Sequence, residues 1–405
     1  MWGPSWMRSG LPSRAERLMI RRVMGVVITG LVMTALAWGQ NDPIAPPSHE
    51  PLVLTFAGDL MQHDRNAAMP DYDRIYDAVR PYLTTDDLSF ANLEFPVDPS
   101  RQPTGYPIFN GSVEYVEAAI HGGFDVLSVA NNHTYDLGEG GLNASRREFN
   151  LIAESHRVFF NGIRPESDAP IDVTPIEANG WAVGFVAITA FSNMRGSAPH
   201  IHLVNYLNPD TATSFLQQVS EWDSEFDLLV VSVHAGTEYT SQPDEHKAQF
   251  FRDLIAHGAD IVWGHHPHVL QPYETIWWGG ATKLILHSTG NFISAQRRLQ
   301  QPFLPVGRWA PTGDLALFRV AVELREGRAH VPVVETPVFT VHEDTEHGLV
   351  PRTFGALFTE QVPLVWRSFY LARYAATRKL LDRPIRGFTF RGMSSLPEFP
   401  ASAQN

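Results

Sequence analysis

The chain has 405 residues, of which 44% are hydrophobic, and this excludes a disordered protein and suits one large or two moderate folded domains. It has no cysteine, which excludes disulfide frameworks, cysteine-ligated metals, thiol nucleophiles and lipoprotein acylation. Its formal net charge of −13 argues against a general nucleic-acid binder, because such proteins present a basic face to the phosphates.

The first 40 residues have the pattern of an export signal. Arg21 and Arg22 precede an uncharged apolar run over residues 23–37, which ends in small residues. The run is shorter than the roughly 20 residues of a membrane span, which favours a cleaved signal peptide over an uncleaved membrane anchor. We therefore expect an exported protein, periplasmic or extracellular. An uncleaved segment would tether it to the cytoplasmic membrane.

Residues 41–50 are polar and proline-rich and are predicted to be a linker, after which strand patterns alternate with helix patterns. Apolar runs typical of buried strands cover residues 52–57, 88–93, 124–130, 181–189, 228–233, 260–263 and 282–287. Helical periodicity covers residues 71–83, 113–121, 142–154, 209–221 and 245–257, with Asp244 as a predicted N-cap. This alternation predicts an α/β domain, which ends in a predicted β-hairpin over residues 315–324 and 331–341.

The α/β domain is expected to cover residues 51–345, followed by a helical extension over residues 346–405 with a frayed tail. Residues 356–380 predict one amphipathic helix with arginines on its polar side. A helix packed on the domain is the favoured interpretation. A role at a membrane surface or with a partner is the alternative.

Polar residues follow nearly every predicted strand, and ligand sites of α/β sheets lie at the carboxyl ends of the strands. These strand ends supply acids, amides and histidines: Asp59, Glu94, Asn132, His133, His234, His265, His266 and His268. Any one of them alone is commonly a cap, a turn residue or a buried structural histidine. Their coincidence at one edge of the fold predicts a metal or catalytic site.

The donor types define the expected chemistry. Carboxylate, amide and imidazole groups suit Mn, Fe, Zn or Mg, and the absence of thiols disfavours softer ions. A metal-bound water would supply the nucleophile for hydrolysis, most naturally of a phosphoester. A histidine beside a ligating asparagine can protonate the leaving group. Asp136, three residues after His133, either orients that imidazole or forms a turn.

The ordered motifs resemble those of the CapA family of poly-γ-glutamate capsule biosynthesis proteins, whose domain is similar to the calcineurin-like metallophosphoesterases. The motifs are GDLM, NLEFP, ANNHTYDLG, HAGTEY, GADIVWGHHPH and STGNF. The resemblance covers about residues 52–320. It implies an α/β fold of the four-layer α/β/β/α metallophosphoesterase-like sandwich type.

The resemblance also implies roles for single residues. The implied metal ligands are Asp59, Glu94, Asn132, His234, His266 and His268, and His265 is an alternative to one of the last histidines. His133 matches the proton donor. Met61 stands where phosphoesterases usually have a histidine, and His63 cannot be assumed to replace it. A site of this kind is expected to hold one divalent metal firmly and a second one weakly.

Two functions from different classes follow. The first is a CapA-like metal-dependent hydrolase that acts on a phosphoester or on an amide of an envelope polymer. The second is a non-catalytic component that handles or exports the polymer, with membrane-bound synthesis or export partners and a structural or substrate-binding metal. A polyglutamate ligand is an anion, and the acidic chain offers it no broad basic groove, so only a bound cation or a local cluster can hold it. An α/β domain without metal is the third and blandest interpretation.

Overall fold

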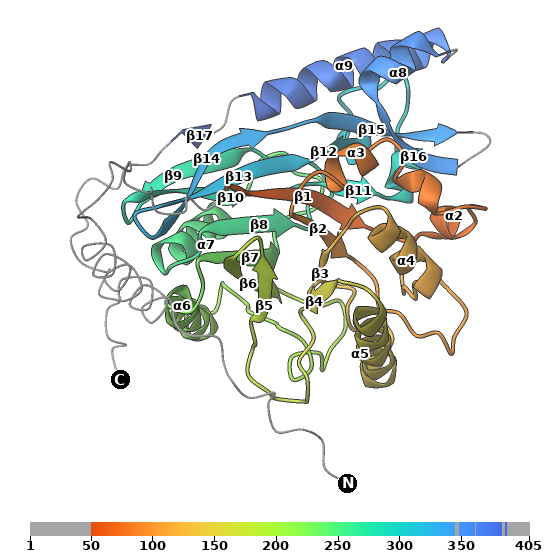
Figure 1. The fold of residues 1–405 in the computed structure, drawn as a ribbon. Coiled ribbons are helices and arrows are strands. Elements are labelled where there is room, and N and C mark those ends of the chain that lie inside the picture. Colours follow the sequence, from red (N-terminus) through yellow and green to blue (C-terminus); the bar gives the residue numbers. More distant parts are fainter. Residues whose placement is uncertain (1–49, 345–347, 361, 383–384, 387–405) are drawn as a thin grey trace, which may run out of the picture.

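We describe a computed structural model of the chain, which covers residues 50–344, 348–360, 362–382 and 385–386 (Figure 1). The predicted signal or anchor, the linker up to residue 49 and the tail beyond residue 386 lie outside the described residues. Within the described segments, no helix is both long enough and apolar enough to span a membrane.

Two mixed seven-stranded sheets form the centre of the described part of the molecule. The first sheet has the order β14-β13-β1-β2-β3-β4, with β11 paired to β1, and β1 to β4 run parallel. Its strands are β1 (Leu52–Leu60), β2 (Leu88–Leu93), β3 (Val126–Ser128), β4 (Phe159–Asn161), β11 (Asn291–Ile293), β13 (Phe318–Arg325) and β14 (Arg328–Glu335).

The second sheet has the order β17-β9-β10-β8-β7-β6-β5, and β6, β7, β8 and β10 run parallel. Its strands are β5 (Thr174–Ala178), β6 (Trp181–Thr189), β7 (Leu228–His234), β8 (Ile261–His265), β9 (Tyr273–Trp278), β10 (Ala281–Leu286) and β17 (Ile385–Arg386). A third, antiparallel sheet contains β12 (Asp314–Ala316), β15 (Val338–Asp344) and β16 (Gly348–Thr353).

Helices cover the outer faces of the two large sheets (Figure 1). On the first sheet these are α4 (Val113–His121), α5 (Gly138–Ser155) and the short elements η1 (Asp73–Ile75) and α3 (Arg80–Leu83), whereas α2 (Asp64–Ala67) lies against β16 of the third sheet. On the second sheet they are α6 (Pro209–Asp223) and α7 (Glu245–Ala256). The remaining helices are η2 (Ala295–Leu299), η3 (Ala310–Gly313), α8 (Phe354–Thr359) and α9 (Leu364–Leu381).

The inner faces of the two large sheets pack against each other through a buried aromatic cluster. Phe56 and Phe90 of the first sheet stack with ring centroids 4.6 Å apart, and Phe90 meets Trp263 of the second sheet at 6.1 Å. With helices on both outer faces, these layers confirm the predicted α/β/β/α sandwich. The all-buried strands explain why their sequences read as continuous apolar runs.

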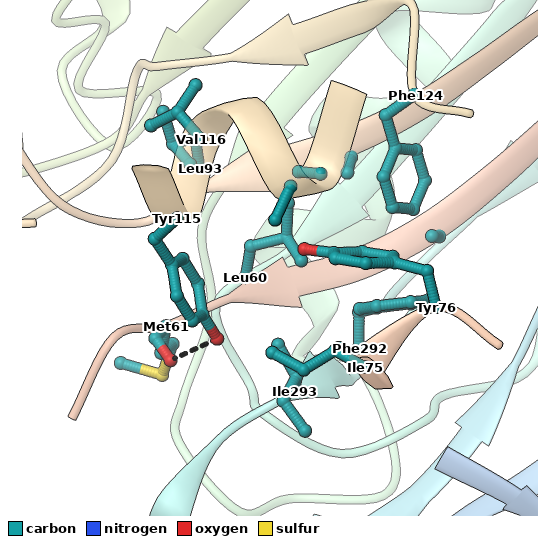
Figure 2. Packing of buried hydrophobic residues seen from close by; sticks show 14 of the residues in the cluster. Leu60, Met61, Ile75, Tyr76, Leu93, Tyr115, Val116, Phe124, Phe292 and Ile293 are labelled. Atoms are coloured by element: carbon teal, nitrogen blue, oxygen red, sulfur yellow. Dashed lines mark hydrogen bonds between the residues drawn. The ribbon is translucent and has the colours of Figure 1, made fainter. Parts of the chain in front are cut away.

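The outer core of the first sheet contains Met61 (Figure 2). Figure 2 shows Met61 at the end of β1, close to Leu60 and Tyr115, and the Tyr115 hydroxyl donates to the Met61 carbonyl at 3.4 Å. Met61 is 1% exposed and belongs to this apolar cluster. The residue in the place of the usual first-motif histidine therefore serves packing.

Three predicted elements are broken at a proline, and the first predicted hairpin strand, over residues 315–324, is divided between β12 and β13, which belong to different sheets. The helix expected over residues 71–83 is instead η1 and α3, because Pro81 lacks the N–H that a continuous helix needs and begins a new turn. The second hairpin strand ends at Glu335, and Pro337 separates it from β15 in another sheet. The single helix expected over residues 356–380 is split into α8 and α9 at Pro363.

The longer helix of this C-terminal pair packs on the domain, as the favoured interpretation predicted. Phe369, Tyr370 and Arg373 of α9 are buried, and the Arg373 guanidinium pairs with Asp314 of β12. The predicted N-cap at the start of α7 is also confirmed, because the Asp244 carboxylate accepts a hydrogen bond from Lys247 N at 2.9 Å.

We expect Gly58→Ala to destabilise the fold, because Gly58, which directly precedes Asp59 in β1, packs against the backbone of Gly290. A Cβ atom at Gly58 would lie 2.0 Å from the carbonyl oxygen of Gly290, which also accepts a hydrogen bond from Asp59 N. We expect a loss of about 1–3 kcal/mol in the free energy of unfolding, measured by urea denaturation. Gly140→Ala is the control, since no atom lies within 4 Å of the added Cβ. Equal stability of the two variants would contradict this close approach.

Candidate metal centre

The carboxyl ends of parallel strands from both large sheets meet at one buried site. Asp59 is the last residue but one of β1, Glu94 follows β2, His234 ends β7 and His265 ends β8, and none of the four is exposed to solvent. This arrangement follows from the topology, because parallel strands place their carboxyl ends at the same edge.

Asp59 and His268 join the two sheets directly. The Asp59 Oδ2 atom lies 3.1 Å from His268 Nδ1, and the same nitrogen lies 3.1 Å from Asn291 Oδ1. The other Asp59 oxygen accepts from Asn92 Nδ2 at 2.8 Å. The Asp59 carboxylate is therefore fixed in position, and Asn291 is held beside it by the pairing of β1 with β11.

A chain of four polar side chains fixes the orientation of His234. His234 Nε2 lies 2.7 Å from Asn132 Oδ1, and His234 Nδ1 lies 2.8 Å from His265 Nδ1. His265 Nε2 in turn lies 2.7 Å from Ser232 Oγ. If His265 donates to His234, the His234 Nε2–H donates to Asn132.

The opposite tautomer satisfies the same heavy-atom positions. If His234 Nδ1–H donates to His265, then His265 Nε2–H donates to Ser232, and the lone pair of His234 Nε2 faces the Asn132 oxygen. Two acceptors at 2.7 Å are stable together only around a positive charge. A shift of protons along Ser232, His265 and His234, with no movement of heavy atoms, would therefore free the lone pair of His234 Nε2 for a metal ion.

Glu94 and His266, which both belong to this cluster, each have a buried polar atom without a hydrogen-bond partner. Glu94 Oε1 and His266 Nδ1 are buried and have no hydrogen-bond partner among the described residues. Glu94 Oε1 lies 3.7 Å from His234 Nε2 and 3.8 Å from His268 Nε2. A buried carboxylate oxygen without a donor is costly, and a cation bound there would compensate its charge.

The candidate ligand atoms form two groups of three. Asp59, His234 and His265 form one group, and Glu94, His266 and His268 form the other, with the atoms of each group within 4.8 Å of one another. His265 belongs to the first group by distance, but both its ring nitrogens have partners in the Ser232–His234 chain. We therefore assign it the task of orienting His234. Carboxylate and imidazole donors in this number fit a borderline divalent cation.

The electrostatics of the site favour neutral histidines and disfavour the free carboxylate. Burial raises the pKa of Glu94 well above its usual range, and the nearby Asp59 carboxylate raises it further. Burial lowers the pKa of His265 to about 3 and holds the pKa values of His234 and His266 well below their usual range. Neutral imidazole is the form that binds metal, so His234 and His266 are ready ligands at neutral pH, and neutral His265 can hydrogen-bond to His234.

Three non-glycine residues in the loops around the site have left-handed backbone conformations. His266 has φ 97° and His268 has φ 57°, and Tyr239 in the neighbouring loop has φ 61°. The Tyr239 N–H donates to the Pro267 carbonyl at 2.8 Å, which ties the two loops together. Left-handed backbone at non-glycine residues costs about 1–3 kcal/mol each and is concentrated at functional sites.

His133 and Asp136 form a separate pair at the border of the cluster. His133 Nδ1 lies 2.7 Å from Asp136 Oδ2, and the same oxygen accepts from Phe109 N at 2.9 Å. The Phe109 ring packs edge-on against the imidazole at 4.7 Å. The aspartate therefore orients the imidazole through Nδ1, which leaves Nε2 for a proton transfer.

The structure brings together all eight residues predicted for the site, counting His133 and Asp136 at its border. Their roles as ligands and acid stay predictions. Sequence reasoning did not assign Asn92 and Asn291, which hold Asp59 and His268, and it left His63 open. The His63 ring packs edge-on against Phe109 at 5.2 Å, and burial lowers its pKa to about 3, with His268 and His133 adding to the shift. His63 therefore borders the site without belonging to either group of ligand atoms.

We expect His265→Ala to weaken metal binding by about 10- to 100-fold, because the substitution frees the ring of His234 to rotate and change tautomer. Isothermal titration of the metal-free protein with Mn²⁺ measures the effect. Ser232→Ala should shift the affinity in the same direction by a smaller factor, and His246→Ala, at an exposed position of α7, should leave it unchanged. Wild-type affinity in His265→Ala would show that His234 needs no support.

Comparison with known proteins gives three results. The family described as "Bacterial capsule synthesis protein PGA_cap" matches residues 53–296. The chain is 28% identical to the PGA biosynthesis protein CapA of Bacillus subtilis, over 85% of this chain and 88% of that protein. It is 29% identical to the capsule biosynthesis protein CapA of Bacillus anthracis, over 76% of this chain and 73% of that protein.

Among solved structures, the calcineurin-like phosphoesterase YfkN of Bacillus subtilis aligns with 83% of this chain and all of its own chain, at 12% identity and a TM-score of 0.41. A hypothetical protein from Thermus thermophilus aligns with 71% of this chain and 99% of its own, at 18% identity and a TM-score of 0.40.

Proposed function

The chain belongs to the bacterial capsule synthesis protein family PGA_cap, and we propose that it is an exported envelope protein that hydrolyses its substrate at a divalent metal centre. The observation that carries this proposal is the pair of unpartnered buried atoms, Glu94 Oε1 and His266 Nδ1, within a cluster of carboxylates and neutral imidazoles. The substrate is a phosphoester or an amide of an envelope polymer. Membrane-bound synthesis or export proteins are the proposed partners.

The residues that would hold the metal are Asp59, Glu94, Asn132, His234, His266 and His268. A divalent ion bound there polarises a phosphoryl or carbonyl oxygen and makes water acidic enough to attack at neutral pH. The number and identity of the ions are part of the proposal: one ion of Mn, Fe, Zn or Mg held firmly, with a second held weakly.

His133 is the proposed proton donor to the leaving group. Its Nδ1–H donates to Asp136, so its Nε2 is the atom that exchanges a proton with the substrate. Asp136 is itself fixed by the backbone N–H of Phe109, which keeps the imidazole in one orientation. General acid catalysis by a positioned imidazole contributes about 10²- to 10⁴-fold to a rate.

A non-catalytic role in polymer handling is the second candidate, and Met61 is the observation that favours it. Its side chain packs in the apolar core at the position where phosphoesterases usually supply a ligand. In this role the metal would be structural or would bind carboxylates of the polymer.

Turnover by the metal-loaded protein decides between the two candidates. Purified protein loaded with Mn²⁺ is assayed with bis(p-nitrophenyl) phosphate and with a γ-linked glutamate oligomer, beside the matched Glu94→Gln variant. We expect hydrolysis of at least one substrate by the wild type and none by the variant. Stoichiometric metal with no turnover of either substrate would support the handling role instead.

A further inference from the structure

An exposed arginine is held on two aromatic rings beside the metal centre. The Arg308 Cζ atom lies 4.7 Å from the ring centroid of Tyr239 and 4.9 Å from that of Trp309. The two rings meet at 4.5 Å and an angle of 65°. Cation–π contacts with two rings restrict the guanidinium and use none of its N–H donors.

The aromatic support is connected to the candidate metal ligands. The Tyr239 ring lies 5.9 Å from the ring of His268. The Tyr239 hydroxyl accepts from Gln296 Nε2 at 3.2 Å, and Gln296 Oε1 accepts from Asn291 Nδ2 at 3.0 Å. Since Asn291 also contacts His268, a continuous polar chain fixes Arg308's support relative to the metal centre.

The charges around this support single out Arg308. Glu238, the neighbour of Tyr239, has a carboxylate oxygen 4.0 Å from His268 Nε2. Burial raises the pKa of the Tyr239 hydroxyl, Glu238 raises it further, and Arg308 opposes the shift. Arg308 makes no ion pair with any acid in the described part of the chain, so its charge is available to a ligand.

An acidic protein that binds an anionic substrate needs a local cation for it. The net charge of −13 provides no broad attractive field, and the candidate metal can neutralise only the group that reacts. A pre-ordered guanidinium beside the centre matches an oxyanion through two parallel hydrogen bonds. No other arginine in the described residues is held on aromatic rings adjoining a candidate ligand.

We propose that Arg308 binds an oxyanion of the substrate next to the bond that is cleaved, with Tyr239 and Trp309 as its support. This inference rests on the proposed hydrolase function and adds a specificity residue to it. The oxyanion is a carboxylate of a γ-linked glutamate chain or a second phosphate of a phosphoester. Both bind a guanidinium fork in the same way.

The test measures binding and turnover in the full chain loaded with Mn²⁺. Isothermal titration with a γ-linked glutamate oligomer gives Kd, and hydrolysis of a phosphoester that carries a second phosphate gives KM and kcat. The variants are Arg308→Gln, Arg308→Lys and, as control, Arg328→Gln, an exposed arginine at the start of β14 near the opposite end of the first sheet.

We expect Arg308→Gln to raise Kd or KM at least about tenfold, with metal content and kcat close to wild type. Arg308→Lys should recover part of the loss, because it keeps the charge without the fork, and Arg328→Gln should resemble wild type. A loss toward the oligomer alone identifies a carboxylate, and a loss toward the phosphoester alone identifies a phosphate. Each of these results supports an oxyanion site.

Two results would overturn the inference. One is wild-type Kd and KM in Arg308→Gln, and the other is an equal loss in Arg328→Gln, which would indicate general electrostatics. Both results would be obtained with variants that still bind metal and hydrolyse substrate, so they would not contradict the proposed hydrolase function. Failure of the proposed function itself is distinguished by the absence of metal or turnover in the wild type.

Discussion

Glu94→Gln is expected to lower the affinity for Mn²⁺ by more than about 100-fold while leaving the metal-free protein as stable as wild type, or more stable. Glu94 is buried beside the Asp59 carboxylate, and its Oε1 atom has no partner among the described residues. In the absence of metal, the charged form of Glu94 therefore costs free energy, and a neutral amide of the same shape removes that cost. In the metal-bound protein, the charged carboxylate of Glu94 would coordinate the ion.

The stability of the metal-free protein should fall as the pH rises. Because the pKa of Glu94 is raised in the folded state, the metal-free wild type loses stability as the pH rises through that pKa. The glutamine variant lacks this loss, so its melting temperature should depend less on pH above the usual range of a glutamate.

Thermal unfolding with and without metal measures both effects. At a metal concentration 100 times Kd, the wild type gains about 2.7 kcal/mol, and the variant should gain little. Glu114→Gln, at an exposed position of α4, is the control that should follow wild type in both conditions. A metal-induced gain in Glu94→Gln equal to that of wild type would show that Glu94 is not a ligand.

His133→Gln is expected to lower kcat by about 10²- to 10⁴-fold with metal content unchanged. The imidazole borders the ligand cluster and makes its hydrogen bond to Asp136, so its loss removes a proton donor without removing a ligand. Asp136→Asn should cause a smaller loss of kcat, because His133 stays in place between Phe109 and the cluster.

Substrates whose leaving groups differ in their need for a proton distinguish a proton-donating role of His133 from a structural role. A substrate with a p-nitrophenolate leaving group needs little protonation, so the His133→Gln defect should shrink on it compared with a substrate that releases an alkoxide or an amine. An equal defect on both, or a loss of metal in His133→Gln, would contradict the role of proton donor.

The long apolar strands and the amphipathic helices could be predicted from the sequence because burial dictates their composition. The expected strands at residues 52–57, 181–189 and 228–233 correspond to β1, β6 and β7, and the helix at residues 113–121 is α4. Three-residue strands such as β4 and β11 leave no such pattern. They exist because neighbouring strands offer them hydrogen-bonding partners.

The candidate site was predictable to the extent that its residues follow strands. Asp59, Glu94, His234 and the histidines after β8 lie where parallel strands end, so their types and positions predicted a cluster. The support of those residues was not predictable, because it depends on contacts across the two sheets. The hydrogen bond between Ser232 and His265 and the stacking of Arg308 on Tyr239 join segments whose sequences carry no matching signal.

Metal content tests the central claim most directly. Elemental analysis of the purified full chain, beside the Asp59→Ala/His268→Ala double variant, gives the number of ions per folded molecule. We predict at least one divalent metal ion per chain in the wild type and none in the variant. A wild type that stays metal-free after incubation with Mn²⁺, Zn²⁺ and Mg²⁺ would contradict the account.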